Sequence, residues 1–288
     1  MMIFIIIPVF NRKVLLYNCL DSLRNQTNQN FQVIVVDDGS TDGTSDMLRE
    51  NFPKATVLKG DGNLWWTGAT NVGVLHALPL CQENDFIMAL NDDLVVGPDY
   101  IEMYYQLAAT HPDTLIGSVV TDINNRDIIY SGGVKINWIT AKTRNINVGK
   151  SLASYGTGYY EEVSILTGRG VLFPSKVFRK IGMYNDKHYA QCGDTELPRR
   201  AQLAGFRLIV SYDVPVFSVV QDEGHINYIE KFKFSHIKKY YFNIRSNSNL
   251  RYRFWFAYDA TPNVIQGTIF FVCDFLRITN HFMKRFRF

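Results

Sequence analysis

Short apolar runs alternate along the first third of the chain with stretches in which apolar side chains recur every three or four residues. The runs are typical of buried strands, and the longer period is typical of helices with one face on a core. In chain order, the pattern predicts a strand that ends at Pro8, a helix over 14–23, a strand over 32–36, a helix over 40–52, a strand over 55–58, a helix over 71–80 and a strand over 86–90. Such alternation predicts βαβ units and an α/β fold.

Beyond Asn91 the spacing is looser and the predicted elements are shorter. The pattern predicts strands over 116–120, 128–130 and 207–211, a turn at Gly132–Gly133, a polar loop over 145–158, and helices over 177–181 and 195–204. The strand over 207–211 is expected to end before Pro215.

Paired carboxylates follow two of the predicted strands. Asp37 and Asp38 come directly after the run at 32–36, and Asp92 and Asp93 follow Asn91 after the run at 86–90. The carboxyl ends of strands in an open α/β sheet line the crevice where ligands bind, so the two pairs are expected to converge there. One isolated pair is more typical of a solvated turn. Two pairs behind two buried strands favour a site.

The two acidic pairs suit a nucleoside diphosphate. Carboxylates with neighbouring amide or backbone oxygens bind hard cations such as Mg²⁺ or Mn²⁺, which fill their remaining positions with phosphate and water oxygens. A carboxylate also accepts a hydrogen bond from the imide N–H of uracil or thymine. We therefore expect one pair to read a base and the other to hold a metal.

Several segments, in order along residues 3–215, resemble motifs of family 2 glycosyltransferases of the GT-A fold, in a bacterial branch that includes rhamnosyltransferase-like proteins. These segments are residues 5–12, 36–42, 62–73, 91–93, 167–174 and 193–200. The resemblance implies a Rossmann-like, mostly parallel sheet flanked by helices. It also implies that residues 1–226 form the catalytic domain, with a nucleotide-sugar half over 1–95 and an acceptor half over 96–226.

The resemblance also implies roles for single residues in the donor half. Asp38 would contact the nucleotide base, and its replacement by Ala is expected to abolish nucleotide binding without disturbing the fold. Asp92 would approach the ribose and Asp93 would hold the divalent cation, Mn²⁺ or Mg²⁺, although Asn91 replaces an acid in this motif. The loop from Pro8 through Phe10 to Asn11 would wall the base.

The general base is expected in the segment 193–200. Asp194 matches the acid that serves as base in the family, and Glu196 is the alternative base. Inverting transfer needs a carboxylate to take the proton of the acceptor hydroxyl while a cation neutralises the departing diphosphate. Asp194 also fits an N-cap of the helix that follows, and such a position lowers the pKa of a carboxyl.

Three other groups have both a functional and a structural interpretation. Trp65 and Trp66 follow glycines and are expected in a loop, where Trp66 would stack on the donor, although Trp pairs more often fill cores. Arg199–Arg200 either offsets diphosphate charge or forms surface pairs with Glu196. His225 lies where some GT-A enzymes supply a metal-binding His, although a lone His is usually structural.

The composition separates a body from a basic tail. The chain has 288 residues, 47% of them hydrophobic, which fits one α/β domain with a C-terminal helical appendage and excludes a disordered protein. Residues 226–288 hold 11 Lys and Arg against 3 Asp and Glu, whereas the rest holds 19 against 24. A domain boundary is therefore expected near Asn227, with a basic, aromatic, helical region over 227–288.

Basic residues among aromatic ones suit a membrane surface or single-stranded nucleic acid. Sugar transfer favours the membrane, so we expect peripheral membrane contact and no nucleic acid. The helix that would lie on the bilayer carries Phe270, Phe271, Phe275, Phe282 and Phe286 with Arg277, Lys284, Arg285 and Arg287. The alternative is a helix that packs its aromatic stripe on the catalytic domain.

No apolar run reaches the roughly 20 residues of a spanning helix. The apolar run over residues 1–7 ends before Pro8 and is expected to form a strand, not a signal peptide. The four cysteines lie far apart without Cys-x-x-Cys spacing, which favours reduced thiols. These features predict a cytoplasmic protein at the inner face of the cytoplasmic membrane.

The sequence as a whole predicts an inverting, metal-dependent glycosyltransferase. Its donor would be a UDP- or dTDP-sugar, and its acceptor a saccharide or lipid-linked saccharide in cell-surface polysaccharide synthesis. A nucleotidyltransferase acting on sugar nucleotides is one alternative, although the segment 8–12 lacks the Gly-rich basic loop of that class. A non-catalytic sugar-nucleotide-binding protein is the other alternative.

Overall fold

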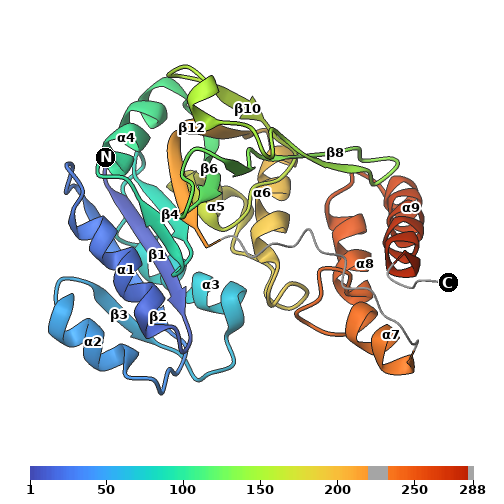
Figure 1. Ribbon diagram of the computed structural model, residues 1–288, viewed down its shortest axis with the longest axis horizontal. Helices are drawn as coiled ribbons and strands as arrows, with labels where there is room; N and C mark the ends of the chain where they lie inside the picture. The colour runs from blue at the N-terminus through green and yellow to red at the C-terminus, as the bar shows by residue number, and fades with distance from the viewer. Residues whose placement is uncertain (220–232, 285–288) are drawn as a thin grey trace.

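The computed structural model describes residues 1–219 and 233–284 and shows a large central sheet with helices on both faces (Figure 1). Its strands are β1 (Ile3–Val9), β2 (Phe31–Asp37), β3 (Thr56–Lys59), β4 (Phe86–Leu90), β5 (Leu94–Val96), β6 (Thr114–Asp122), β7 (Ile129–Ser131), β10 (Tyr160–Glu162), β11 (Arg169–Pro174) and β12 (Arg207–Ser218). The main strand order is β10-β12-β6-β11-β4-β1-β2-β3. β11 and β10 run against the other six, so the mostly parallel sheet is confirmed.

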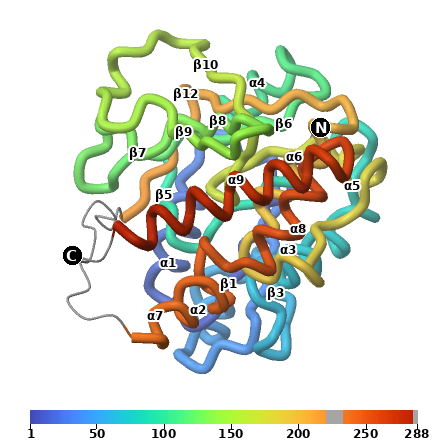
Figure 2. Tube along the Cα trace, turned by 90° about the vertical axis from the view of Figure 1, so that its right-hand side faces the viewer, coloured from blue at the N-terminus to red at the C-terminus, as the bar shows by residue number. Residues whose placement is uncertain are grey.

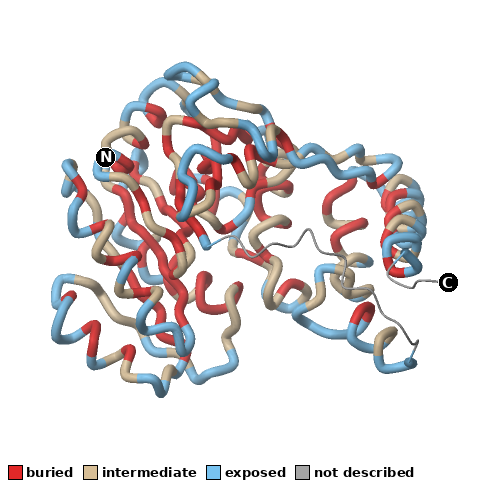
Figure 3. Tube along the Cα trace, viewed as in Figure 1, coloured by how far each residue is buried: buried red, intermediate tan, exposed pale blue. Residues whose placement is uncertain are grey.

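The helices form a layer on each face of this sheet. Helices α1 (Lys13–Arg24), α2 (Thr44–Asn51) and α4 (Tyr100–Thr110) pack on one face, and α3 (Trp65–Ala77), α5 (Ser175–Ile181) and α6 (Gly193–Leu203) pack on the other. Alternate side chains of β1 serve the two layers: Ile5 contacts the first cluster and Ile6 the second. Burying one such side chain contributes about 1.5–3 kcal/mol, so the sheet centre anchors both layers. Figure 3 shows this centre as almost entirely buried.

The two largest errors in the predicted boundaries have different reasons. Helix α3 begins at Trp65 and not near residue 71, because the small residues of its first turns give no apolar period although they are buried. β12 continues through Pro215 to Ser218, because the register with β6 shifts between Ser211 and Val216. Proline is tolerated at such an irregularity.

Several elements were not predicted from the apolar pattern. They are α4, β5, β11, β10, the hairpin of β8 (Val134–Ile136) and β9 (Thr143–Asn145), and the 3-10 helix η1 (Leu152–Ser154). The predicted turn at Gly132–Gly133 is present between β7 and β8. Most of these elements are only three residues long, too short to show a period.

The C-terminal region forms α7 (Phe234–Tyr241), α8 (Leu250–Asp259) and α9 (Val264–Met283), at the right of Figure 1. Its inner side is packed: Phe270 of α9 stacks on Trp138, with ring centroids 5.7 Å apart. Arg199 of α6 lies over the same Trp138 ring at 3.9 Å and donates to the Ala260 carbonyl. Arg199 therefore docks this region on the body. The boundary predicted near Asn227 lies outside the described residues.

Helix α9 has two apolar sides. Phe270 and Phe282 of the predicted membrane stripe are buried together with Ile278, so this part of the stripe faces the protein. Figure 2 looks onto α9 from outside, where Ile265, Ile269, Val272 and Leu276 are exposed. Within residues 1–219 and 233–284, no helix is long and apolar enough to cross a membrane.

Candidate active site

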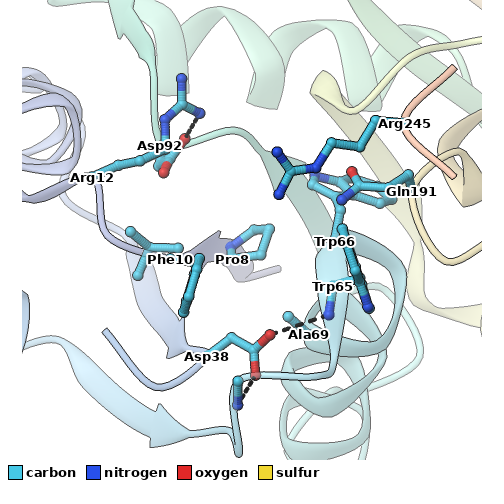
Figure 4. Close-up of a pocket in the computed structure, with 12 residues that line it drawn as sticks. Pro8, Phe10, Arg12, Asp38, Trp65, Trp66, Ala69, Asp92, Gln191 and Arg245 are labelled. Atoms are coloured by element: carbon cyan, nitrogen blue, oxygen red, sulfur yellow. Dashed lines mark hydrogen bonds and ion pairs between the residues drawn. The ribbon is translucent and has the colours of Figure 1, made fainter. Parts of the chain in front are cut away.

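A cavity of about 220 Å³ opens at the carboxyl end of β1 and β2 (Figure 4). Pro8 and Phe10 line it from β1 and its following loop, as the sequence predicts. Asp38, Trp66 and Asp92 line it as well, so the cavity joins the first acidic pair to the second. Further lining residues are Val9, Arg12, Gly62, Trp65, Ala69, Gln191 and Arg245.

The Asp38 carboxylate is held at the bottom of this cavity by three backbone donors. Its Oδ1 accepts from Gly62 N at 2.9 Å, and its Oδ2 accepts from Leu64 N and Trp65 N at 3.0 and 3.1 Å. These groups precede or begin α3, so Asp38 caps that helix from another element. A carboxylate has about four lone-pair positions, which leaves one on Oδ1 for a ligand N–H.

Trp65 is held in an uncommon conformation by this contact. Its φ is 57°, in the left-handed region that a bulky residue rarely adopts. Such strain is of order 1–3 kcal/mol and persists where the surroundings fix it. The loop also depends on Gly60, because a Cβ there would lie 2.4 Å from Asp38 Oδ1. The sequence interpretation of Trp65–Trp66 as a loop is corrected: both residues belong to the first turn of α3.

Two neighbouring residues are structural. Asp37 is buried and accepts from Ser40 N and from the Ser45 hydroxyl at 2.9 and 2.7 Å. Asn11, expected beside the base, is absent from the cavity wall; its Oδ1 accepts from Thr41 N at 2.8 Å. Both residues fix the turn after β2, and only Asp38 of the first acidic pair reaches the cavity.

The second acidic pair is engaged by a cation of the chain itself. Arg12 Nη1 lies 2.7 Å from Asp92 Oδ1, and Arg12 Nη2 lies 3.1 Å from Asp93 Oδ2. Burial raises the pKa of Asp92 to about 7, although Arg12 lowers it. Asp92 is buried, whereas Asp93 is about one third exposed. Arg12 ends the segment 5–12, but no sequence pattern predicts its contact with these acids, which lie 80 and 81 residues away.

The donor set fits a cation that shares its coordination with a ligand. Among the described residues, no three His, Cys, Asp or Glu side chains lie together as a complete metal cage. Asp92 lines the cavity, whereas Asp93 is absent from its wall and lies next to it, in contact with the wall residue Arg12. Both offer carboxylate oxygens, and Mg²⁺ and Mn²⁺ accept phosphate oxygens in their other positions. His225, the further predicted ligand, lies outside the described residues.

Trp66 connects the cavity to the segment of the expected base. Its Nε1 donates to Asn91 Oδ1 at 2.9 Å. Its ring abuts Gly168, where a Cβ would lie 2.4 Å from the indole. Gly168 N in turn donates to Asp194 Oδ2 at 3.0 Å. The contacts therefore run from the loop after β4 to the start of α6.

Asp194 lies in the first turn of α6, and the N-cap position belongs to Cys192. The interpretation of Asp194 as the cap is therefore not supported. Burial raises the pKa of Asp194, while the hydrogen bond from Gly168 and the charge of Arg169 lower it. Asp194 is not part of the wall of the 220 Å³ cavity. Gly168, which contacts both Asp194 and the wall residue Trp66, lies between them.

Glu196, the alternative base, is buried and paired. Arg200 Nε donates to Glu196 Oε1 at 2.7 Å, one turn along α6. Arg200 also donates to the carbonyls of Ile181 and Met183. Arg200 therefore ties α6 to the end of α5 while it holds the buried Glu196 carboxylate, whereas Asp194 is only half-buried.

The sheet, the flanking helices and the acidic cavity at the strand ends define an α/β protein with a candidate ligand site at the carboxyl edge of its sheet. Residues 4–161, more than half of the chain, match the model of Glycosyl transferase family 2. The chain belongs to this family.

Curated relatives include poly(ribitol-phosphate) beta-glucosyltransferase of Bacillus spizizenii, 23% identical over 231 residues, which are 78% of this chain and 33% of that protein. N-acetylglucosaminyl-diphospho-decaprenol L-rhamnosyltransferase of Mycobacterium tuberculosis is 24% identical over 229 residues, 72% of this chain and 71% of that protein. Glycosyltransferase GlyA of Streptococcus pneumoniae is 22% identical over 62% of this chain and 25% of its own length. The chain thus spans about a quarter to a third of GlyA and the glucosyltransferase.

Solved structures of similar fold include the mannosyltransferase PcManGT from Pyrobaculum calidifontis in complex with GDP-Man and Mn²⁺. Its TM-score is 0.59 at 17% identity, over 95% of this chain and 68% of that chain. Residues 1–349 of S. aureus TarS in complex with UDP give a TM-score of 0.55 at 17% identity, over 77% and 61%. These likenesses confirm the GT-A fold.

Proposed function

We propose that the protein is an inverting, metal-dependent glycosyltransferase that uses a UDP- or dTDP-sugar donor. The single observation that carries the proposal is that Asp38 and Asp92, which follow different strands, line one cavity at the carboxyl edge of the sheet. Ligands of open α/β folds bind at this edge. The UDP and GDP-Man complexes of the similar structures support a nucleotide-sugar ligand.

In this proposal the nucleotide base of the donor lies between Phe10 and the start of α3. Pro8 and Phe10 supply an apolar wall, and Trp65 and Trp66 supply aromatic surface opposite it (Figure 4). The remaining lone pair of Asp38 Oδ1 accepts the imide N–H of uracil or thymine. Cytosine lacks that N–H, so a uridine or thymidine nucleotide is preferred.

The diphosphate lies toward Arg12, Asp92 and Asp93. A divalent cation bound there supplies Lewis-acid stabilisation of the leaving diphosphate. Asp93 would bind the cation, and Asp92 would contact the ribose of the donor. Arg12, which now engages both carboxylates, is long enough to turn from them toward phosphate oxygens. The similar structure with Mn²⁺ supports a divalent cation.

Asp194 is the proposed general base. The acceptor hydroxyl oxygen attacks the anomeric carbon, the bond from that carbon to the diphosphate oxygen breaks, and Asp194 takes the hydroxyl proton. Burial makes this carboxylate more basic than a solvated one. Its contact with Gly168, against which Trp66 packs, supports a place beside the donor sugar.

The proposed acceptor is a saccharide or lipid-linked saccharide in cell-surface polysaccharide synthesis. The names of two relatives support this class: one acts on poly(ribitol-phosphate) and the other on N-acetylglucosaminyl-diphospho-decaprenol. Peripheral contact with the inner face of the cytoplasmic membrane is part of the proposal, through the exposed side of α9. The division into residues 1–226 and 227–288 also belongs to the proposal.

A thermal-shift screen tests the donor proposal, because a ligand that binds only the folded state raises the midpoint. We expect UDP or dTDP to raise it more than CDP does, and Mn²⁺ to enlarge the shift. A glycosyltransferase then hydrolyses or transfers the sugar of the preferred nucleotide, whereas a non-catalytic binding protein gives the shift without turnover. Release of pyrophosphate from a nucleoside triphosphate and a sugar phosphate would instead favour the nucleotidyltransferase.

A further inference from the structure

A second cavity, of about 300 Å³, lies between residues 187–192 and the C-terminal region. Gln191 lines both this cavity and the donor cavity, so the two are neighbours. The second cavity has no assigned role in donor binding. Its walls combine residues from two parts of the chain that the charge pattern separates into body and tail.

The cavity adjoins the proposed general base. Cys192, which lines it, is the N-cap residue of α6, and Asp194 lies in the first turn of that helix. Tyr252 of α8 also lines it, and its hydroxyl lies 2.9 Å from Thr195 Oγ1, the residue after Asp194. A molecule in this cavity therefore lies near Asp194, the proposed general base, where the acceptor is expected to bind.

The charged residues of the cavity are all basic. Lys187 and Arg251 line it, together with His188, and no Asp or Glu does. Across residues 1–219 and 233–284, neither Lys187 nor Arg251 forms an ion pair. Most other arginines near the candidate site are engaged; Arg253, for example, pairs with the buried Asp274. Two cations without an acidic partner at one cavity indicate an anionic ligand.

The aromatic residues give this cavity a surface for a sugar ring. Tyr252 lines it with a half-buried ring that the hydroxyl contact with Thr195 fixes. Tyr189 is also in the wall but is almost fully buried, and it donates to Asp259 at 2.6 Å. Aromatic faces and polar edges together suit a carbohydrate better than a bare inorganic ion.

We propose that this second cavity binds a phosphate group on the acceptor, held by Lys187 and Arg251, and so selects a phosphate-bearing saccharide over a neutral one. The inference rests on the proposed glycosyl transfer, since it places the acceptor beside Asp194. It specifies the substrate class through residues that take no part in donor recognition.

Inorganic phosphate is the probe, titrated calorimetrically into full-length protein that is already saturated with UDP and Mg²⁺. Saturation fills the donor cavity, so remaining phosphate binding reports the second cavity. We expect saturable binding by the wild type and at least about tenfold weaker binding by Lys187→Gln and by Arg251→Gln, the loss of about 1.4 kcal/mol. Both residues are exposed, so neither change should alter folding.

Lys239→Gln is the matched control, because it removes one exposed charge from α7 without touching the cavity. It should bind phosphate and UDP as the wild type does. Phosphate affinity that survives both cavity substitutions, or falls equally in Lys239→Gln, overturns the assignment; so does wild-type protein that binds UDP but no phosphate. Failure of the wild type to bind any nucleoside diphosphate would instead count against the proposed function. In that case, phosphate titration of the ligand-free wild type and of the two cavity variants still decides whether the second cavity binds phosphate.

Discussion

Arg12 places its guanidinium on Asp92, with Nη1 2.7 Å from Oδ1, and reaches Asp93 with its other terminal nitrogen. The guanidinium thus occupies an oxygen of Asp93, the carboxylate proposed for the divalent cation, as well as an oxygen of its neighbour Asp92. A guanidinium and a metal ion cannot share those oxygens fully, so the two compete. This relationship makes metal binding dependent on a residue that lies 80 positions earlier in the chain than Asp92.

Arg12→Ala is therefore expected to strengthen Mn²⁺ binding to the donor-free protein by about tenfold, the effect of losing one charge-assisted hydrogen bond of about 1.5 kcal/mol. Calorimetric titration with Mn²⁺ at pH 8 measures it. Arg24→Ala removes a comparable exposed pair with Asp21 and should change nothing. Identical Mn²⁺ affinities in Arg12→Ala and the wild type would show that Arg12 does not compete.

Asp93→Asn is expected to abolish the enhancement of donor binding by Mn²⁺ while UDP retains part of its metal-free affinity. The change replaces a charged ligand by a neutral one of equal size and leaves the base region untouched. UDP affinity is measured with and without Mn²⁺. The assignment fails if the ratio of the two affinities equals that of the wild type.

Asp38→Ala has a different expected outcome once the structure is known. The sequence alone suggested lost nucleotide binding in an intact fold, but Ala leaves the N–H groups of Gly62, Leu64 and Trp65 without their acceptor. We expect the free energy of unfolding to fall by about 1–3 kcal/mol, along with lost UDP binding. Denaturant unfolding and calorimetry measure the two effects. If Asp38→Ala is as stable as the wild type and still binds UDP, Asp38 neither stabilises the start of α3 nor contacts the nucleotide base.

Asp194→Asn is expected to keep donor affinity and to lower transfer by about 100-fold or more, the range for loss of a general base. Its stability should also differ from that of the wild type in a pH-dependent way. Burial raises the pKa of Asp194 in the folded state, so the wild type loses stability as the pH rises from the unfolded pKa through the folded pKa. Asn does not ionise, so the variant should be the more stable protein at neutral pH, with the difference shrinking in acid.

Glu196→Gln is the matched comparison. It breaks the ion pair with Arg200 in a buried setting and is expected to lower stability while transfer by the folded fraction persists. If Glu196→Gln loses transfer and Asp194→Asn keeps it, the general base is Glu196 and not Asp194. Full activity in both variants would remove the base from this segment.

Deletion of residues 262–288 is expected to destabilise the protein, because it removes Phe270 from Trp138. Ile269→Ser with Leu276→Ser changes only the exposed side of α9. We expect weaker co-sedimentation with anionic vesicles and an unchanged melting temperature. Phe270→Ala should instead cost about 3–5 kcal/mol of stability. Vesicle binding that survives the double substitution counts against membrane contact through α9.

The sequence by itself determined the α/β fold and the acidic pairs at the strand ends. Apolar runs such as Ile3–Val9 report burial on both faces directly, because every side chain of a central strand is covered. Acids that follow such runs must emerge at the sheet edge. The placement of Asp38 and Asp92 at one cavity therefore followed from local pattern and the connectivity of parallel strands.

Only the tertiary structure decided which partners these residues have. Arg12 and Asp92 are 80 residues apart, and Arg245 reaches the donor cavity from the C-terminal region. The helix that begins at Trp65 is capped by Asp38 from another element, so no local signal marks its start. Periodicity records which side of an element is buried, whereas ion pairs, tertiary caps and shared cavities depend on distances between elements that the packed chain alone sets.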